Sequence, residues 1–376
     1  MSQTAHFAAH IELATGLFRD LLSSERRAAR ALYTAFYREL WISAATDVGA
    51  TVSELSDGTL EIGLGTGRVR VRNTHCSIDG REVIDRSRNK ALVCRMLTKA
   101  GLPVPAHKVF SLATLGAAQG FLAAAQSPCV VKPARDTGAG QGVTTGVRMP
   151  VDLQRAAVAA AAAGARGGRK GRSGALASRL VGMLRSLSTV PLLVEHQVSG
   201  ANYRLLYLDG MLLDAIRRDP PTVTGDGRSS VKALIDRVNS ERLRSGGLHG
   251  QRLITRDLDL ARTLAAQGLH ETTVPAAGLV VRLKTTINEN SPDRNHPARH
   301  ELCEEIIEDG RRAAALVGAR LAGVDILTLD PSVPLAKSGG CLLEVNTTPG
   351  LAMHHHSHPG QVAPAIALLR QLATRS

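Results

Sequence analysis

Apolar residues recur along this chain at two spacings, which separate predicted helices from predicted strands. Over residues 11–45 they recur every three to four positions, and this spacing predicts a helix with one apolar side. Shorter stretches within 58–73 are separated by glycines and predict the strands of a small sheet. Residues 89–100 return to the helical spacing and are followed by Gly101. The first part of the chain is therefore predicted to combine helices with strands.

Runs of apolar residues predict further strands on both sides of a glycine-rich loop. Cys129–Pro133 and residues 143–147 both have the composition of buried strands. The loop between them carries three spaced glycines: Gly138, Gly140 and Gly142. In a Rossmann fingerprint a helix follows the glycines, and a Walker A loop ends in Gly-Lys-Ser/Thr, so this loop matches neither motif.

A segment rich in glycine and arginine separates these strands from the next group. We predict a helix over residues 156–163 and then a flexible basic loop over 164–174, for which a solvated insertion is favoured over a lid. Residues 191–195 and 203–208 predict two more strands. The last helix is expected over 362–372.

Two short motifs near the end of the chain carry candidate metal ligands. Glu344 and Asn346 are two positions apart in a predicted strand, so both side chains lie on one of its faces. Asp325 adds a carboxylate from another apolar run. Hard oxygen ligands of this kind suit Mg²⁺, which commonly binds substrate phosphates as well. These residues predict a magnesium site beside a nucleotide site.

Length and composition narrow the classes of protein that fit. The chain has 376 residues, 44% of them apolar, which is enough for two or three domains and excludes general disorder. No apolar run reaches the roughly 18 residues that span a bilayer, and no signal peptide precedes the chain's first helix, so we expect a cytoplasmic protein with no membrane partner. The five cysteines are far apart and are expected to be reduced thiols.

The chain is strongly basic, with a net charge of +13 and a pI near 10.1. Nucleic acid is one partner class for such a charge, but aromatic residues make up only 3% and no recognition motif accompanies the charge. Binding of anionic small molecules explains the charge as well, and a general bias toward arginine and alanine explains part of it. Nucleic acid is therefore not the expected partner.

Taken together, these segments resemble the ATP-grasp superfamily over roughly residues 40–360. The likeness is strongest to the ATP-grasp portion of cyanophycin synthetase, with glutathione synthetase and D-alanine:D-alanine ligase as wider relatives. It rests on several ordered motifs, among them Arg88-Asn89-Lys90 and Val131-Lys132-Pro133. The resemblance implies an α/β (α+β) fold in which two α+β subdomains grip ATP.

The resemblance also implies a domain organisation. Residues 1–85 are expected to form a small N-terminal α/β domain and 86–376 the ATP-grasp domain. Within the latter, a glycine-loop subdomain covers about 86–190 and a C-terminal subdomain with the metal site about 191–376. Cyanophycin synthetase continues into a Mur-ligase-like domain, whereas this chain stops soon after Gly360, so we expect that it cannot make the full two-amino-acid polymer alone.

The family motifs assign ATP-binding roles to residues of this chain. Lys90 and Lys132 would contact phosphates, and the glycine loop would fold over them. Glu195 and the backbone near Val198 would receive adenine, while Asn202 would bind the ribose, where many relatives carry an acidic residue. The set implied by the resemblance is Lys90, Lys132, Gly138, Gly140, Gly142, Glu195, Val198 and Asn202.

The same resemblance implies metal ligands and catalytic residues. The metal ligands would be Asp325, Glu344 and Asn346, holding two Mg²⁺ ions, with Mn²⁺ as an alternative. The catalytic set would be Arg204, Arg217 and His354. The arginines would stabilise the transferring phosphoryl group or an acyl phosphate, and a surface position is an alternative for Arg218. His354 would orient substrate or transfer a proton.

Two features of the sequence leave alternatives open. The cluster of His354, His355, His356 and His358 could instead bind a transition metal, although soft ligands are absent nearby. Lys284 and Asn288 lie where relatives carry a glycine-containing loop near the substrate, but residues 289–293 replace the glycines. We therefore expect the choice of substrate to differ from that of the relatives.

The resemblance implies an acid-amino-acid ligase that joins a carboxylate to an amine. ATP would phosphorylate the carboxylate, and the amine would then attack the acyl phosphate, with release of ADP and phosphate. Its substrates would be small amino acids or peptides, and homo-oligomers occur among the relatives. One alternative is an ATP-dependent modifier of a protein side chain or terminus. Another is a non-catalytic protein that binds nucleotide or nucleic acid.

Overall fold

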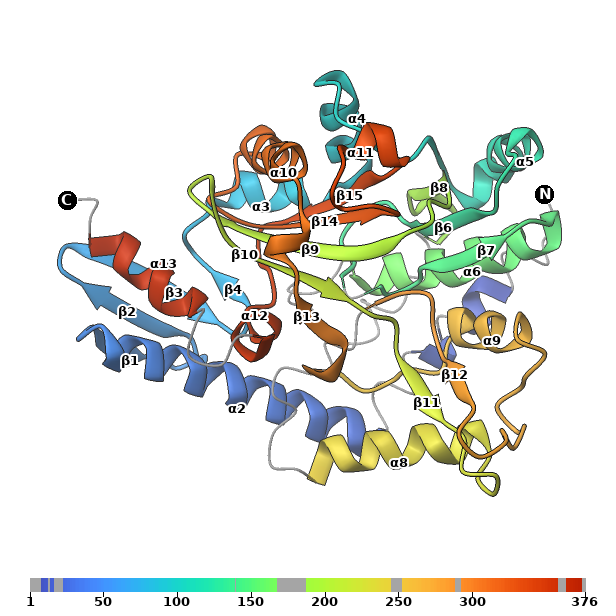
Figure 1. The fold of residues 1–376 in the computed structure, drawn as a ribbon, viewed down its shortest axis with the longest axis horizontal. Helices are drawn as coiled ribbons and strands as arrows, with labels where there is room; N and C mark the ends of the chain where they lie inside the picture. The colour runs from blue at the N-terminus through green and yellow to red at the C-terminus, as the bar shows by residue number, and fades with distance from the viewer. Residues whose placement is uncertain are drawn as a thin grey trace.

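The computed structural model describes residues 8–12, 14–16, 23–138, 140–167, 187–244, 252–287, 292–357 and 363–373. Figure 1 shows a five-stranded sheet in the middle of the molecule, with an N-terminal sheet on one side and the sheet of the glycine-rich loop on the other. Helices pack on these sheets, so the predicted α/β (α+β) class is confirmed.

The five-stranded sheet is antiparallel and has the order β13-β10-β9-β14-β15. Its strands are β9 (Ala201–Leu208), β10 (Met211–Arg218), β13 (Asn295–Pro297), β14 (Leu321–Thr328) and β15 (Cys341–Asn346). One face packs on α4 (Lys90–Lys99) and α10 (Glu304–Val317). Tyr203, Leu205 and Tyr207 alternate along β9 and are buried in this layer, as strand geometry requires.

The N-terminal unit and the last helix cover one end of the opposite face. Their elements are α2 (Ser24–Asp47), β1 (Thr51–Glu54), β2 (Leu60–Leu64), β3 (Gly67–Arg72), β4 (His75–Cys76) and α13 (Pro364–Ala373). Leu206 and Leu208 of β9 share a core with Tyr37 and Trp41 of α2 and with Leu368 of α13. This core is therefore built from both ends of the chain, and a domain boundary near residue 85 stays a prediction.

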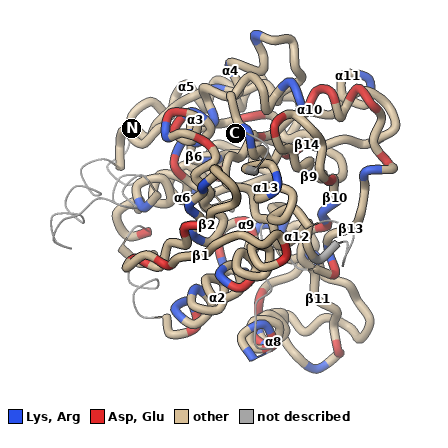
Figure 2. The backbone as a smooth tube through the Cα atoms, turned by 90° about the vertical axis from the view of Figure 1, so that its left-hand side faces the viewer, with Lys and Arg blue, Asp and Glu red and all other residues tan. Residues whose placement is uncertain are grey.

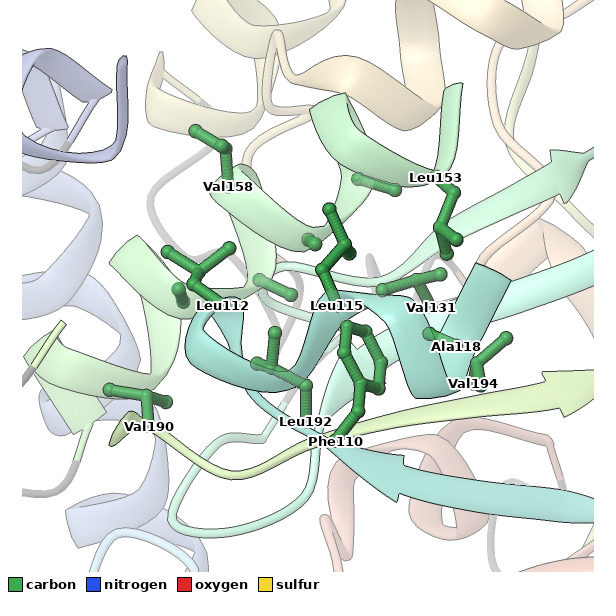
Figure 3. Packing of buried hydrophobic residues seen from close by; sticks show 14 of the residues in the cluster. Phe110, Leu112, Leu115, Ala118, Val131, Leu153, Val158, Val190, Leu192 and Val194 are labelled. Carbon is green, nitrogen blue, oxygen red and sulfur yellow. The ribbon is translucent and has the colours of Figure 1, made fainter. Parts of the chain in front are cut away.

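A second four-stranded sheet carries the glycine-rich loop and has the order β5-β8-β6-β7. Its elements are β5 (His107–Phe110), β6 (Cys129–Pro133), β7 (Thr144–Val147) and β8 (Leu192–His196), with α5 (Leu115–Ala124) and α6 (Pro150–Gly167) packed on it. Figure 3 shows Phe110, Leu115 and Val131 meeting in the core between sheet and helices. The strands predicted on both sides of the glycine loop are confirmed.

The predicted basic loop over 164–174 begins too early, because α6 continues to Gly167. Gly164 is buried inside this helix, and a Cβ at that position would lie 2.7 Å from Cγ1 of Val190. Glycine is therefore needed there for close packing of the helix rather than for a turn. Residues 168–174 lie outside the described part of the chain.

A smaller unit extends below the central sheet in Figure 1. It comprises β11 (Thr222–Thr224), α8 (Val231–Arg244), α9 (Leu258–Ala265) and β12 (Val280–Arg282). Asp259 at the start of α9 is buried and accepts hydrogen bonds from Thr145 of β7 at 3.0 Å and from the hydroxyl of Thr286 at 2.9 Å. This carboxylate thus connects the small unit to the strand that follows the glycine-rich loop.

The remaining elements are short connections. In the described part of the chain they are α3 (Arg81–Ser87), α11 (Leu335–Ser338), α12 (Ala352–Ser357) and 3₁₀ turns at Leu112–Thr114, Leu187–Thr189, Pro292–Arg294 and Arg299–Glu301. No helix in the described ranges is long and apolar enough to cross a membrane.

Basic and acidic residues are mixed over the elements seen in Figure 2 rather than separated onto different elements. Several exposed arginines are paired with carboxylates in neighbouring segments: Arg38 with Glu54, Arg70 with Glu61, and Arg311 with Glu308. Such pairs neutralise part of the positive charge locally, so the net charge alone does not define a nucleic-acid surface.

Candidate active site

A row of charged side chains crosses the central sheet beside the apolar end described above. Arg204 lies on the same face of β9 as Leu206, because side chains two positions apart share a face. Arg204 is opposite Asp325 of β14, and Asp325 is opposite Glu344 of β15. Strand register therefore brings together three residues that are far apart in sequence.

A β-bulge in β15 turns the side chain of Glu344 to the sheet face that carries Arg204 and Asp325. The register pairs Ile326 with Leu342 and Asp325 with Glu344, which leaves Leu343 as the extra residue. In a regular strand Leu342 and Glu344 would share a face, whereas the bulge lets Leu342 enter the core while Glu344 joins the charged row. Asn346 donates from Nδ2 to Oε1 of Glu344 at 2.9 Å, so these two side chains meet on one face as predicted.

Asp325 is held by two arginines in a buried cluster. Arg204 donates through Nε and, at 2.8 Å, through Nη2, and Nη2 of Arg218 lies 3.0 Å from Oδ1 of Asp325. Arg218 also donates from Nε to Asn202 at 2.8 Å. Burial lowers the pKa of Arg218 and so does the like charge of Arg204, although Asp325 acts in the opposite direction. Gly323 makes room for the cluster, since a Cβ there would lie 3.0 Å from Nη1 of Arg204.

Lys90, at the start of α4, forms an ion pair with Glu344. Asn89 caps α4 by accepting a hydrogen bond from the backbone N–H of Leu92, which fixes the start of the helix. Nζ of Lys90, in the first turn, lies 2.6 Å from Oε2 of Glu344. Burial alone would raise the pKa of Glu344, but the charge and hydrogen bond of Lys90 hold it well below its usual range.

Lys132 and Glu195 form a second buried pair on the neighbouring strands β6 and β8. Their Nζ and Oε1 atoms are 2.7 Å apart, and both side chains are at most 10% exposed. Burial has the largest single effect and lowers the pKa of Lys132, but the charge and hydrogen bond of Glu195, with smaller contributions from Cys94 and Glu344, together raise it by more, so the net shift is upward. Oε2 of Glu195 is buried and has no hydrogen-bond partner among the described residues. A buried acceptor of this kind fits a ligand N–H donor such as an exocyclic amine.

The glycine-rich loop connects β6 to β7 close to Lys132. Gly140 and Gly142 have φ values of 65° and 72°, a region that favours glycine. A Cβ at Gly142 would also lie 2.6 Å from the Cβ of Ala163 in α6, so this glycine has a packing role as well. Gly138 is exposed, and Val198 is half-buried in the loop after β8.

Arg217 is not part of this cluster, so the structure does not bring this predicted catalytic residue together with Arg204. Neighbouring residues of a strand point to opposite faces, so only one of Arg217 and Arg218 can join the charged row. Arg217 instead bonds Glu301 at 2.9 Å on the face of Tyr203. Arg218 is buried, which excludes the surface position that was the alternative for it. The sequence did not reveal which arginine faces the site, because that depends on the pairing of β10 with β9.

His354 is fully buried in α12, where its Nδ1 lies 2.7 Å from Oδ2 of Asp214 on β10. Burial lowers the pKa of His354, Asp214 opposes this, and the nearby charges of Arg204 and Arg218 lower it further. Sequence reasoning missed Asp214, although an acidic residue inside the apolar strand β10 was a usable signal.

The transition-metal alternative for the histidine cluster finds no support in the described ranges. His355 is exposed, while the side chains of His356 and His358 lie outside the described part. No group of three or more His, Cys, Asp or Glu side chains in that part of the chain could hold a metal ion. Lys284 is buried, with Nζ 2.6 Å from Oδ2 of Asp257 at the start of α9, and Asn288 is not described.

The donor set around the row nevertheless fits magnesium and a nucleotide. Carboxylate and amide oxygens of Asp325, Glu344 and Asn346 are hard ligands on one sheet face, and magnesium needs few protein ligands when phosphates supply others. Lys90 and Lys132 supply positive charge for phosphates, and the free oxygen of Glu195 offers an acceptor at the other end. In the present structure these cations and carboxylates neutralise one another.

No protein-family profile matches the chain, but individual proteins do. The cyanophycin synthetase of Trichormus variabilis is 28% identical over 317 residues, covering 84% of this chain and 31% of that protein. The glutathione biosynthesis bifunctional protein of Enterococcus faecalis is 25% identical over 279 residues, covering 73% of this chain and 33% of that protein. The chain thus spans about a third of the length of these curated relatives.

Among solved structures, a bifunctional glutathione synthetase from Pasteurella multocida matches with a TM-score of 0.51 at 23% identity. The match covers 89% of this chain and 44% of that one. The fold is therefore that of the ATP-grasp proteins, as the sequence motifs predicted. Within this class the chain is related in sequence to the cyanophycin synthetases.

Proposed function

We propose that this chain is an ATP-dependent carboxylate-amine ligase that forms an amide bond through an acyl phosphate and releases ADP and phosphate. One observation carries the proposal: two groups of buried or half-buried ion pairs lie side by side on neighbouring strands. Lys90 pairs with Glu344, and Asp325, which is opposite Glu344 in the sheet, pairs with Arg204 and Arg218. Buried charges are costly, and a concentration of them in a soluble fold is typical of a site that binds charged ligands.

Some of these residues would bind the nucleoside of ATP and others its phosphates. Glu195, with its unpaired Oε2, would accept the exocyclic amine of adenine, and Asn202 would bond the ribose. Lys90 and Lys132 would offset phosphate charge, and the glycine loop would bring backbone N–H groups close to the oxyanions. This assignment agrees with the burial and pairing of these side chains.

The chemistry requires activation, because a carboxylate is a poor electrophile. Phosphoryl transfer from ATP turns one carboxylate oxygen into a leaving group, and the amine then displaces phosphate. Arg204 and Arg218 offer planar donor groups for the transferring phosphoryl group or the acyl phosphate. Asp325, Glu344 and Asn346 would hold magnesium, which when bound neutralises charge on the phosphates.

The substrates that fit this proposal are amino acids or small peptides, as in the reactions of the relatives named above. A cytoplasmic location, homo-oligomer formation, and the choice between Mg²⁺ and Mn²⁺ stay predictions. Modification of an acidic protein is the alternative, since the basic chain would attract such a target.

The test is release of ADP and phosphate with Mg-ATP against a panel of amino acids and dipeptides. Glu344→Ala serves as the inactive variant and Glu308→Ala, on the exposed side of α10, as the matched control. Stimulation by one substrate pair in wild type and Glu308→Ala, absent from Glu344→Ala, supports ligation and identifies the substrates. Nucleotide binding without stimulation by any pair would contradict small-molecule ligation and favour modification of a protein.

A further inference from the structure

The contact between Asp214 and His354 provides a second polar feature next to the charged row. Both side chains are at most 2% exposed, and Nδ1 and Oδ2 are 2.7 Å apart. A carboxylate oxygen can only accept at this distance unless it is protonated, so the contact favours a proton on Nδ1 of His354. The hydrogen bond connects α12 to β10, four residues before Arg218.

The other ring nitrogen of His354 is unusual. Nε2 is buried and has no hydrogen-bond partner among the residues that the structure describes. A buried polar atom without a partner destabilises the fold, so such atoms in native proteins call for an explanation, a catalytic role being one. Its partner Asp214 is opposite Leu206, two positions along β9 from Arg204, which places the ring close to the charged row.

The helix that carries His354, α12, is also held by a hydrogen bond to α2. The hydroxyl of Tyr37 in α2 accepts a hydrogen bond of 3.3 Å from the backbone N–H of Ala352, the first residue of α12. Tyr37 is fully buried in the core shared by α2 and α13. The histidine is thus held by its ring and by its helix, both of which limit rotation toward other partners.

We propose that Asp214 is a positioning residue that keeps His354 in the Nδ1-protonated tautomer, and that Nε2 accepts a proton from the amine substrate, directly or through one water. This inference rests on the proposed ligase function and adds its proton acceptor. Arg204 and Arg218 favour a neutral ring here, since a second proton would place another cation beside two guanidinium groups. A neutral imidazole is the form that can accept a proton.

An acceptor is needed because the α-amino group of a peptide arrives mainly as an ammonium ion below its usual pKa of about 8, and that of a free amino acid is more basic still. Its first proton passes to Nε2, and the nitrogen lone pair attacks the acyl carbon. The C–N bond forms, the C–O bond to phosphate breaks, and the phosphate leaves with that electron pair. The second N–H proton goes to the leaving phosphate, and His354 then returns its proton to solvent, so atoms and charges balance.

The first test is a histidine long-range ¹H–¹⁵N NMR spectrum of the full chain near neutral pH without substrate. His354→Asn identifies the His354 signals by their loss, because the Asn amide can still donate to Asp214. We expect a neutral ring protonated on Nδ1, and a shift toward the Nε2-protonated form in Asp214→Ala. A wild-type ring protonated on Nε2, or on both nitrogens, would overturn the proposal. This readout does not depend on ligase activity.

The second test compares an amine with hydroxylamine, which is already neutral near pH 7 and needs no acceptor for its first proton. For His354→Asn we expect amide formation to fall about 100-fold or more, the usual contribution of a general base, and hydroxamate formation to fall less than about 10-fold. Thermal unfolding close to that of wild type would show that the variant folds. An equal fall in both products, or no fall in either, would assign the pair a purely structural role. Absence of both products in wild type would instead contradict the ligase function itself.

Discussion

On one face of the central sheet, the same strands carry apolar side chains at one end and charged side chains at the other. At one end, Leu206 and Leu208 of β9 and Leu321 of β14 pack under α2 and α13. At the other end, Arg204 of β9 and Asp325 of β14 form a buried ion pair. The alternation of side chains is the same at both ends, and only the covering elements and the chemistry of the residues differ.

This difference separates stability from function. Burial of apolar side chains at the leucine end stabilises the fold by about 25 cal/mol for each Å² removed from water. Desolvation of the charged end offsets most of the attraction between its ions, so apolar residues would stabilise that end at least as well. Under the proposed function the charged end binds the ligands, so substitutions at the two ends should have different consequences.

Substitution of Asp325 by leucine should have the largest effect. Removing this carboxylate leaves Arg204 and Arg218 buried without their partner, and breaking such a pair costs about 3–5 kcal/mol of unfolding free energy. Urea unfolding measures the loss. Replacing both arginines by methionine in the same variant should restore most of the stability but no ATP turnover. A stable single variant would contradict the cost assigned to the cluster.

Leu206→Ala at the apolar end should lower the unfolding free energy by about 2–5 kcal/mol, because the side chain is fully buried and leaves a cavity. Turnover per folded molecule should change little, in contrast to every substitution in the charged row. Unfolding and ADP release measured on the same preparation separate the two effects. Loss of turnover without loss of stability would mean that the apolar end also serves the site.

Arg218→Gln and Arg217→Gln form a matched pair of neighbouring substitutions on opposite faces. Arg218→Gln should lower ATP turnover about tenfold or more, since one hydrogen bond to a transition-state charge is worth at least that much. Arg217, whose side chain is 35% exposed and bonded to Glu301, should tolerate the change within about threefold. Steady-state kinetics with the substrates found in the panel provide the comparison, and equal losses would return Arg217 to the catalytic set.

Glu195→Gln should weaken nucleotide binding by about 1 kcal/mol, close to the value of one hydrogen bond, or roughly fivefold in Kd. Isothermal titration with ATP and with inosine triphosphate, which lacks the exocyclic amine, tests the role of the free oxygen. Wild type should prefer ATP, and the variant should lose part of this preference. An unchanged preference would place adenine elsewhere.

The smallest expected effect is the pH dependence of the stability that Glu344 contributes at the charged end. The pKa of Glu344 is depressed in the folded protein, so its stabilising contribution is present above the unfolded value of about 4.3 and is lost as pH falls below it. The difference in unfolding free energy between wild type and Glu344→Gln should therefore shrink from pH 6 to pH 3. The exposed Glu82→Gln provides the control, and a difference that grows toward low pH would reverse the assigned direction.

Local patterns predicted much of the site because the physics involved is local. The spacing of Glu344 and Asn346 put both side chains on one strand face, and the glycines between two apolar runs predicted a loop between strands. Lys132 followed from its position in the first of those strands. Each of these inferences needed only a few consecutive residues.

Other features depended on segments far apart in the chain. The choice of Arg218 over Arg217 follows from the register of β10 on β9, and the contact of Asp214 with His354 joins residues 140 positions apart. The sequence predicted that a loop begins at Gly164, whereas this glycine lies inside α6 and packs against Val190.

The sequence by itself determined the residue types of the site and the strands and helices that carry most of them, because side-chain periodicity and backbone preferences act over a few residues. Only the tertiary structure decided which face each strand shows to the site, which charges meet, and that α2 and α13 cover the apolar end. Those features arise from register and from long-range packing, whose energies depend on partners that no local stretch of sequence specifies.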